Sequence, residues 1–290
     1  MSWKRKAVDR ANAVLRRSAG LEITRAGQPK RPAASRKPQF PLAAVPPEER
    51  LLSQPVFILS SIRSGSTLLR MLLGSHSELH APHELHLRNI GVTMRTRNTV
   101  ASMAAIGLDQ EGLEHLLWDR LLARQLRLSG KKVLVNKTPS DAFIWRRIST
   151  CWPDARYVFL LRHPLSVVRS RQAANPHQPM ETQIARTMSY MKAVEEARAA
   201  LPGLTVRYED LTADPEAVTR EICAFLGVGW EPGMLEYGGD EDMRRGLGDW
   251  SDRIKSGAVQ PPRPLPAADE IPDELMPLCR AWGYLPAERG

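Results

Sequence analysis

The residues best suited to chemistry lie in a loop of small polar side chains, Ser60–Thr67, with the sequence SSIRSGST. The loop follows a short apolar run, Pro55–Leu59, and precedes leucines at helical spacing. A loop between a buried strand and the start of a helix directs backbone N–H groups and the positive helix end toward one point. This arrangement predicts a binding site for a phosphate or sulfate group.

The same loop differs from a nucleoside-triphosphate loop where that loop carries its cation. A Walker loop reads GxxxxGK[ST]; aligned on Gly65, this chain has Ser60 for the first glycine and Ser66 for the lysine. The missing lysine removes the cation that contacts the β- and γ-phosphates. None of the later predicted strands ends in a Walker-B acid, so we predict neither an ATPase nor a GTPase. A small-molecule kinase with a degenerate loop is the alternative among enzymes.

Four histidines, at positions 76, 80, 83 and 86, raise the question of a metal site. The segment His83–Leu87 misses the zinc pattern HExxH by one position, and Pro82 interrupts any helix that could align the imidazoles. We therefore predict chemistry without a metal.

Three further strands are predicted beyond the loop unit, with helical patterns between them. The strands are Lys132–Asn136, Arg156–Leu161 and Leu204–Tyr208. The helical patterns include Asp109–Leu128, Met180–Ala200 and Pro215–Leu226. The alternation predicts a three-layer, P-loop-like α/β fold whose central parallel sheet has about four or five strands flanked by helices.

This fold gathers the motifs that follow the strands at one edge of the sheet, next to the loop. The motifs are Lys137-Thr138-Pro139, Arg162-His163-Pro164 and Tyr208-Glu209-Asp210-Leu211. Lys137 is a candidate cation for the site, with a surface ion pair as its alternative role. For the third motif, the alternative is structural, with an acid that caps a helix or pairs with loop arginines.

Three of these segments together carry a family resemblance. Ser60–Leu69 resembles the 5′-phosphosulfate loop of sulfotransferases that use 3′-phosphoadenosine 5′-phosphosulfate (PAPS). Arg162, followed eight residues later by Ser170, resembles their 3′-phosphate motif, and Tyr208–Leu211 resembles a third shared segment. The similarity covers about two hundred residues, Pro55–Gln260, and each motif stands at the end of a predicted strand.

The resemblance implies transfer of a sulfuryl group from PAPS to a hydroxyl, which leaves 3′-phosphoadenosine 5′-phosphate (PAP). It implies that Arg162 and Ser170 hold the 3′-phosphate. Arg63 and Lys137 are the cations for charge that develops on the leaving phosphate. The remaining expected donor contacts are Ser64, Gly65, Ser66, Thr67, Tyr208, Lys255 and Ser256.

Glu84 is the expected general base. It stands where tyrosylprotein sulfotransferases, which this chain resembles, carry a catalytic glutamate, and the segment around it resembles the PELHL segment of polyketide-synthase sulfotransferase domains. Many other sulfotransferases use a histidine after the loop helix. His86 and His83 are therefore the alternative bases.

The charge of the chain is concentrated at its beginning. Residues 1–50 hold twelve Lys or Arg and four acids, a net charge of +8, whereas the whole chain has a net charge of +9. The remaining residues are therefore nearly neutral. We predict a flexible basic arm over 1–50 and a sulfotransferase domain over 51–290. The arm is a solvated tail, or it docks on an acidic partner or an anionic membrane surface. Specific nucleic-acid binding is not expected, although a non-catalytic protein that binds anions or nucleic acid is an alternative.

Cysteine usage and hydropathy indicate a cytoplasmic protein. Cys151, Cys223 and Cys279 are odd in number and form no CxxC pair, which favours a reducing compartment. No apolar run approaches the ~18 residues of a membrane helix, and the first residues lack the apolar region of a signal peptide.

The acceptor is expected to carry a hydroxyl on a small molecule, a lipid or polyketide, or a carbohydrate. Arg88–Gly107 has no clear period and is expected to form a loop or short helices over the strand ends. Its arginines at 88, 95 and 97 indicate an anionic or carrier-bound acceptor, or else a solvated face.

Overall fold

The structure is a computed structural model, and it describes residues 49–237, 257–261 and 263–286. Nearly all of the predicted arm at 1–50, together with the candidate contacts Lys255 and Ser256, lies outside the described residues. Those predictions stay predictions.

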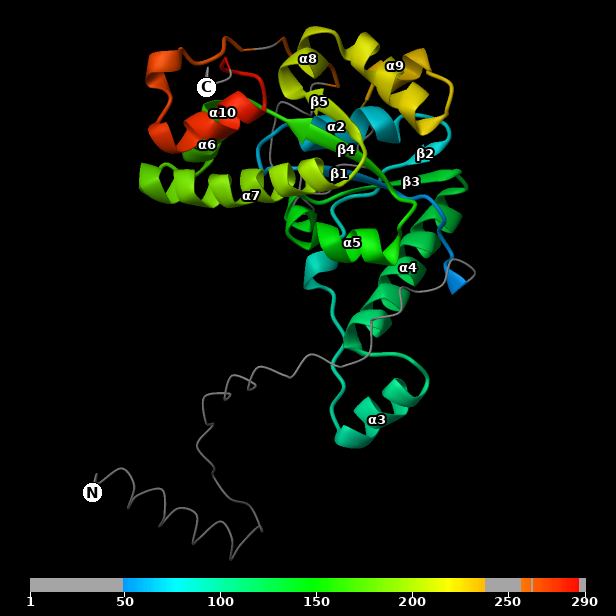
Figure 1. Ribbon diagram of the computed structural model, residues 1–290. Coiled ribbons are helices and arrows are strands. Elements are labelled where there is room, and N and C mark those ends of the chain that lie inside the picture. Colours follow the sequence, from blue (N-terminus) through cyan, green and yellow to red (C-terminus); the bar gives the residue numbers. More distant parts are fainter. Residues whose placement is uncertain (1–48, 238–256, 262, 287–290) are drawn as a thin grey trace, which may run out of the picture. The chain divides into compact units, whose positions relative to one another are not determined.

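Five parallel strands form one sheet in the order β2-β3-β1-β4-β5 (Figure 1). They are β1 (Val56–Ser60), β2 (Leu79–His80), β3 (Val133–Lys137), β4 (Arg156–Leu161) and β5 (Leu204–Arg207). The predicted α/β fold and its four strands are confirmed, two of them one residue further along. Sequence reasoning missed β2, because two residues are too few to show an alternation.

The central position of β1 places its loop between two neighbours. All five residues of β1 are buried, and Ile58 lies opposite Lys137 in β3 while Ser60 lies opposite Leu160 in β4. The segments that follow β1, β3 and β4 therefore leave the sheet at adjacent points.

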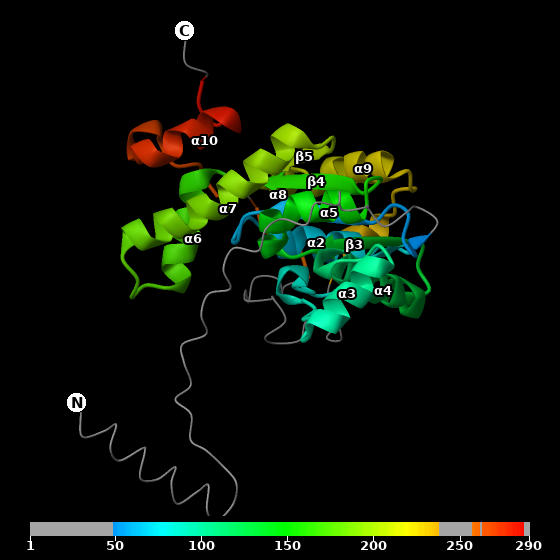
Figure 2. The same cartoon turned by 60° about the horizontal axis from the view of Figure 1, so that its bottom comes forward.

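Helices cover both faces of the sheet (Figures 1 and 2). One face carries α2 (Ser66–Gly74), α8 (Tyr208–Ala213) and α9 (Pro215–Leu226). The other carries α4 (Gln110–Ser129), α5 (Trp145–Cys151) and α7 (Met180–Ala200). Among the described residues, no helix is long and apolar enough to cross a membrane.

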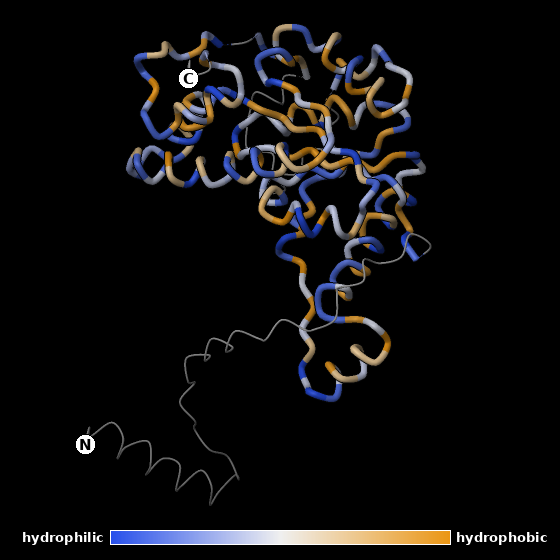
Figure 3. The backbone as a smooth tube through the Cα atoms, in the orientation of Figure 1, coloured by the Kyte–Doolittle hydropathy of each residue, from blue (hydrophilic) through white to orange (hydrophobic). Residues whose placement is uncertain are grey.

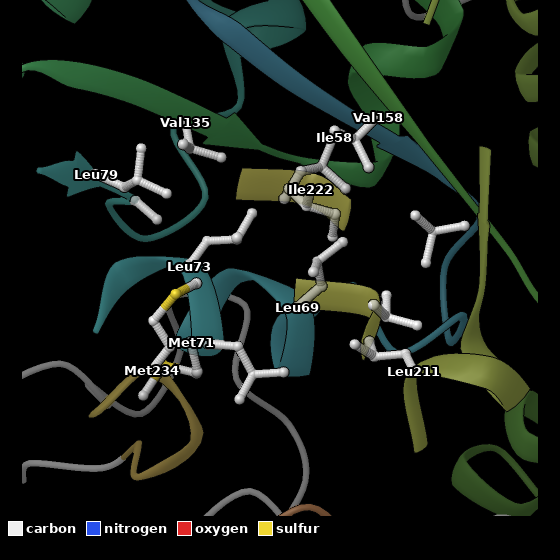
Figure 4. Packing of buried hydrophobic residues seen from close by; sticks show 14 of the residues in the cluster. Ile58, Leu69, Met71, Leu73, Leu79, Val135, Val158, Leu211, Ile222 and Met234 are labelled. Atoms are coloured by element: carbon white, nitrogen blue, oxygen red, sulfur yellow. The ribbon is translucent and has the colours of Figure 1, made fainter. Parts of the chain in front are cut away.

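Alternate residues of β1 supply the two cores, because successive strand side chains point to opposite faces. Ile58 packs with Leu69 and Leu73 of α2 and with Ile222 of α9 (Figure 4). Phe57 belongs to the opposite cluster, which also contains tryptophans of α4 and α5. In Figure 3 hydrophobic segments gather in the region where Figure 1 places the sheet, as is expected of buried parallel strands.

Aspartate side chains cap the starts of two helices. The Asp109 side chain accepts a backbone hydrogen bond from the first turn of α4 at 2.7 Å, and Asp214 does the same for α9 at 2.9 Å. These caps satisfy N–H groups that have no partner within the helix. The predicted bounds of α7 and α9 are confirmed to the residue.

A third hydrophobic cluster packs the last described segment, residues 263–286, against two helices. α6 (Pro164–Ala174) packs beside α7, and α10 (Met276–Ala281) lies against both. The helix predicted over Pro272–Trp282 is instead divided into a 3-10 turn, η7 (Asp273–Leu275), and α10.

Beyond Arg88, which contacts Phe143 in the turn after β3, the segment to Gly107 does not cover the strand ends. It contains a 3-10 turn, η2 (Leu87–Asn89), and α3 (Arg97–Ala105), which has no buried residue. Figure 1 shows α3 at the beginning of α4, away from the sheet. Val100 within α3 is 47% exposed, and Ile106 just beyond it is 65% exposed.

Candidate active site

A cleft of about 1170 Å³ lies at the carboxyl ends of the strands. Its walls come from the loop after β1, from α6, and from Tyr208 at the start of α8. Of the sequence-predicted site residues, the cleft lining includes Arg63, Gly65, Ser66, Thr67, Glu84, Arg162, Ser170 and Tyr208. Residues far apart in the sequence therefore meet in one place, as the parallel sheet predicted.

The loop after β1 is shaped by a close approach at Gly65. This residue has a φ of 90°, and a Cβ atom added to it would lie 2.2 Å from Cδ2 of Tyr208. Only glycine fits both constraints. No side chain caps the amino end of α2, so its first-turn N–H groups are open to an anion in the cleft.

Arg63 and Arg162 meet on the α6 side of the loop. Arg63 has a φ of 62°, and its Nε donates to the Ser170 hydroxyl at 3.3 Å. Arg162 donates to the Arg63 carbonyl at 2.9 Å, and its guanidinium lies 4.3 Å from the Tyr208 ring centroid. Burial lowers the pKa of both arginines below the usual value, which reflects the cost of holding cations out of water.

Glu84 and Lys137 form a buried ion pair beside the loop. Lys137 Nζ lies 2.6 Å from Glu84 Oε1 and 3.3 Å from the Thr67 hydroxyl. The lysine side chain is fully buried and the glutamate side chain 11% exposed, so the alternative of a surface ion pair is wrong. The pair connects the expected base to the anion-binding loop.

His86 is close to Glu84 but lies at the surface. Its Nε2 is 3.8 Å from Glu84 Oε2, and its side chain is 48% exposed. His83 is exposed as well, whereas His76 hydrogen-bonds to the Gly229 carbonyl at 2.5 Å. The histidines are thus dispersed, and the described part of the chain contains no cluster of His, Cys, Asp or Glu that could hold a metal.

Asp141 is a second carboxyl group near the Glu84–Lys137 pair, and it was not predicted as a site residue from the sequence. It lies in η3 (Pro139–Ile144), is buried, and accepts a hydrogen bond from Asn136 Nδ2 at 2.8 Å and one from the Arg88 backbone. Burial is the main cause that raises its pKa to about 7. The available signal was its position four residues after Lys137, in the turn that follows β3.

The same turn holds the segment that carries Glu84. The Thr138 hydroxyl accepts a hydrogen bond from the His86 backbone at 3.3 Å, and the Arg88 guanidinium lies 4.5 Å from the Phe143 ring centroid. His86 has a φ of 52° and, with Arg63, is one of two non-glycine residues with positive φ in the described chain. Arg63 lies within the loop, and His86 lies two residues after Glu84. Strained residues of this kind are often found at functional sites.

Glu209 has a structural role, although not the one expected. It accepts hydrogen bonds from the His163 backbone at 3.1 Å and from the Tyr284 hydroxyl at 2.6 Å. It therefore joins the end of β4 to the last described segment, and no described arginine forms an ion pair with it. Tyr208 is the residue of this motif that faces the cleft.

The charge of the lining suits a ligand with several negative groups. Its arginines are Arg63, Arg162, Arg169, Arg171 and Arg263, and its one acid among the described residues is Glu84. The buried Nε of Arg162 has no hydrogen-bond partner in the described structure. An unpaired buried guanidinium nitrogen, in an arginine that lines the same cleft as Ser66 and Ser170, fits a phosphate group.

Comparisons with known proteins agree with this geometry. Residues 55–232 match the model described as "Sulfotransferase family". The nodulation protein NoeE of Sinorhizobium fredii (strain NBRC 101917 / NGR234) is 23% identical over 220 residues, which cover 64% of this chain and 52% of that protein. Protein-tyrosine sulfotransferase 2 of Gallus gallus is 25% identical over 199 residues, which cover 63% and 53%. The chain thus spans about half the length of these curated relatives.

Two solved structures have the same fold. The sulfotransferase domain from the curacin biosynthetic pathway is 25% identical with a TM-score of 0.58, and the match covers 81% of this chain and 99% of that chain. The sulfotransferase domain from the Synechococcus PCC 7002 olefin synthase is 27% identical with a TM-score of 0.59, and the match covers 81% and 98%.

Proposed function

The chain belongs to the sulfotransferase family, and from this premise we propose that it transfers a sulfuryl group from PAPS to a hydroxyl of its acceptor. The observation that carries the proposal is the contact of the Glu84–Lys137 pair with Thr67 in the anion-binding loop. A base, a cation and an anion cradle are thereby within reach of one another. The family assignment leaves the kinase alternative without support.

The cleft residues divide between the two ends of the donor. The open N–H groups and hydroxyls of Ser66 and Thr67 hold the 5′-phosphosulfate. Arg162 and Ser170, joined through Arg63, hold the 3′-phosphate. When bound, PAPS supplies an activated sulfuryl group and a stable leaving phosphate.

Glu84 and Lys137 act as a coupled pair in the transfer. Glu84 accepts the proton of the acceptor hydroxyl, and this neutralises the carboxylate that compensates Lys137. The buried lysine then needs another negative partner, and its second neighbour is Thr67 in the loop. When Glu84 takes up the proton, the Lys137 ammonium group therefore stabilises the negative charge that develops on the phosphate at the loop.

The acceptor is a hydroxyl of a small molecule, a lipid or polyketide, or a carbohydrate. The names of the relatives indicate chemically different acceptors or pathways for those proteins, so they do not select one for this chain. The predicted arginines outside the lining give little guidance. Arg95 and Arg97 are exposed beside or within α3, and Arg88 contacts Phe143.

Nucleotide binding tests the proposal directly. Isothermal titration of the full chain should show PAP binding without magnesium and weaker binding of ATP. Arg162→Ala should weaken PAP binding at least about tenfold, because a charge-assisted contact to the 3′-phosphate is lost. Lys192→Ala, an exposed charge change on α7, is the matched control. Unchanged PAP affinity in Arg162→Ala would overturn the 3′-phosphate assignment, and magnesium-dependent ATP binding without PAP binding would overturn the function.

A further inference from the structure

Arg171 lines the cleft but is not among the residues that we assign to the donor. It lies on α6, directly after Ser170, and therefore about 100° around the helix from it. The cleft continues past it along the carboxyl end of α6, where Ala173, Ala174 and Asn175 line the wall. The phosphate groups of the donor are already matched by Arg162, Ser170 and the loop.

The Arg171 side chain is only partly exposed, and it has no ion-pair or hydrogen-bond partner among the described residues. Its Nε is buried, and no described residue accepts a hydrogen bond from it. Arg169, two residues earlier in α6, differs because its guanidinium pairs with Glu270 at 2.7 Å. On α7, Arg198 likewise pairs with Glu195 at 2.9 Å. Arg171 thus differs from Arg169 and Arg198, because no described carboxylate pairs with it.

The charged groups that face Arg171 raise the free-energy cost of its own positive charge. They are Arg186 from α7 and Arg63 from the loop, both cations, together with Tyr190. Burial and these two cations lower the pKa of Arg171 below its usual value. Arg186, which is exposed, also forms no ion pair with a described carboxylate. Like charges held together beside a cleft are stabilised when a ligand brings the anion.

We propose that Arg171, assisted by Arg186, binds a carboxylate or phosphate group of the acceptor, so that the acceptor is an anionic hydroxyl compound. A guanidinium donates two parallel N–H groups and so matches both anions in a bidentate manner. This inference rests on the proposed function. It names the acceptor class and adds an anion subsite to a cleft in which Arg63 and Arg162 are assigned to the donor.

The test uses three matched acceptors with the full chain saturated with PAP. They are 3-hydroxyoctanoate, 3-hydroxyoctyl phosphate and the neutral methyl 3-hydroxyoctanoate, and binding is measured by isothermal titration. We expect at least one anion to bind about tenfold or more tightly than the ester. Arg171→Gln should abolish this preference while PAP affinity stays within about twofold. The anion that binds more tightly identifies carboxylate or phosphate as the source.

Two further variants keep the test decisive. Arg186→Gln alters an exposed side chain, should fold normally, and should reduce the preference about threefold. Lys192→Gln on the same helix is the control and should leave the preference unchanged. An ester that binds as tightly as both anions, no binding of any acceptor, or a preference that survives Arg171→Gln and Arg186→Gln would overturn the subsite.

Titrations without PAP separate this inference from the proposed function. If PAP fails to bind, the proposed function is contradicted. The subsite is then decided by titrating the anions into the free protein. Their tighter binding relative to the ester should be lost in Arg171→Gln and kept in Arg162→Ala. Loss of the preference in Arg162→Ala but not in Arg171→Gln would place the anion at the donor site and overturn the inference.

Discussion

The Glu84–Lys137 pair takes two opposite charges out of water together, so each depends on the other. Their 2.6 Å contact compensates the buried lysine, and removal of one partner of such a pair costs about 3–5 kcal/mol. The pair is therefore a structural element as well as the proposed proton acceptor. A variant that keeps the hydrogen bond but not the basicity separates the two roles.

Glu84→Gln should abolish turnover while it leaves PAP binding intact. The amide oxygen can still accept from Lys137, whereas it cannot take a proton, and loss of a general base lowers turnover about 10²- to 10⁴-fold. Sulfuryl transfer from labelled PAPS and PAP titration are the measurements. His86→Gln, at an exposed neighbour, is the comparison. If Glu84→Gln keeps its turnover and His86→Gln loses it, the base is His86.

Asp141→Asn should change stability in a pH-dependent way. The pKa of Asp141 is raised from 3.8 to about 7, so from about pH 4 to 7 the folded protein keeps a proton that the unfolded chain has released. Stability at this site therefore falls as pH rises through that window, and the ionised carboxyl is costly above it. We expect similar Tm values for variant and parent at pH 5, and a variant Tm higher by about 2–4 °C or more at pH 8.

Asp269→Asn, at an exposed position, is the control for this comparison and should show no such trend. A Tm difference for Asp141→Asn that is the same at both pH values would show that the carboxyl is not the titrating group.

At the scale of elements, the site depends on how the loop after β1 meets the start of α8. Tyr208 lies against the Gly65 backbone on one side and under the Arg162 guanidinium on the other. The ends of β1, β4 and β5 are thereby packed into one unit. The predicted motifs are consequently not independent binding groups, because a change in one moves the others.

Gly65→Ala should impair both folding and PAP binding. The left-handed φ of 90° and the contact with Tyr208 both oppose a methyl group, and strained backbone costs about 1–3 kcal/mol. Gly130→Ala is the matched control, since Gly130 has a φ of 67° but nothing within 4 Å of the added Cβ. Both variants should lower Tm, Gly65→Ala by more, and only Gly65→Ala should weaken PAP binding. Equal effects on PAP binding would show that the close packing is unimportant for the site.

At the scale of the whole molecule, the basic charge and the fold are separate properties. Residues 1–50 hold twelve of the 41 Lys and Arg residues. The folded part nevertheless reaches to Arg50, which pairs with Asp154 at 3.7 Å, and the Leu51 backbone donates to Asp119 at 2.6 Å. A truncation that tests the arm should therefore end at residue 48.

Removal of residues 1–48 should leave the domain folded and abolish salt-sensitive binding to vesicles that contain anionic lipid. Basic residues near an anionic surface contribute about 1 kcal/mol each, and the contribution is screened by salt. Tm should change by less than about 2 °C, because the contacts of Arg50 and Leu51 are retained. A large fall in Tm would show that the arm packs on the domain, and unchanged vesicle binding would remove its docking role.

The sequence by itself determined four of the five strands, the long helices between them and the loop that opens α2. These follow from local patterns: buried strands read as continuous apolar runs, and a proline such as Pro215 marks a helix start. The motifs that follow the strands also placed Lys137 and Arg162 at the correct edge, since parallel strands end together.

Only the tertiary structure decided which of these residues touch. Glu84 and His86 are two positions apart, so sequence order cannot tell that Glu84 pairs with buried Lys137 while His86 faces outward. The same holds for Asp141, whose burial raises its pKa, and for Arg171, whose missing partner is visible only among its neighbours in space. Desolvation and pairing depend on distances between segments remote in the chain, and those distances are set by packing rather than by local sequence.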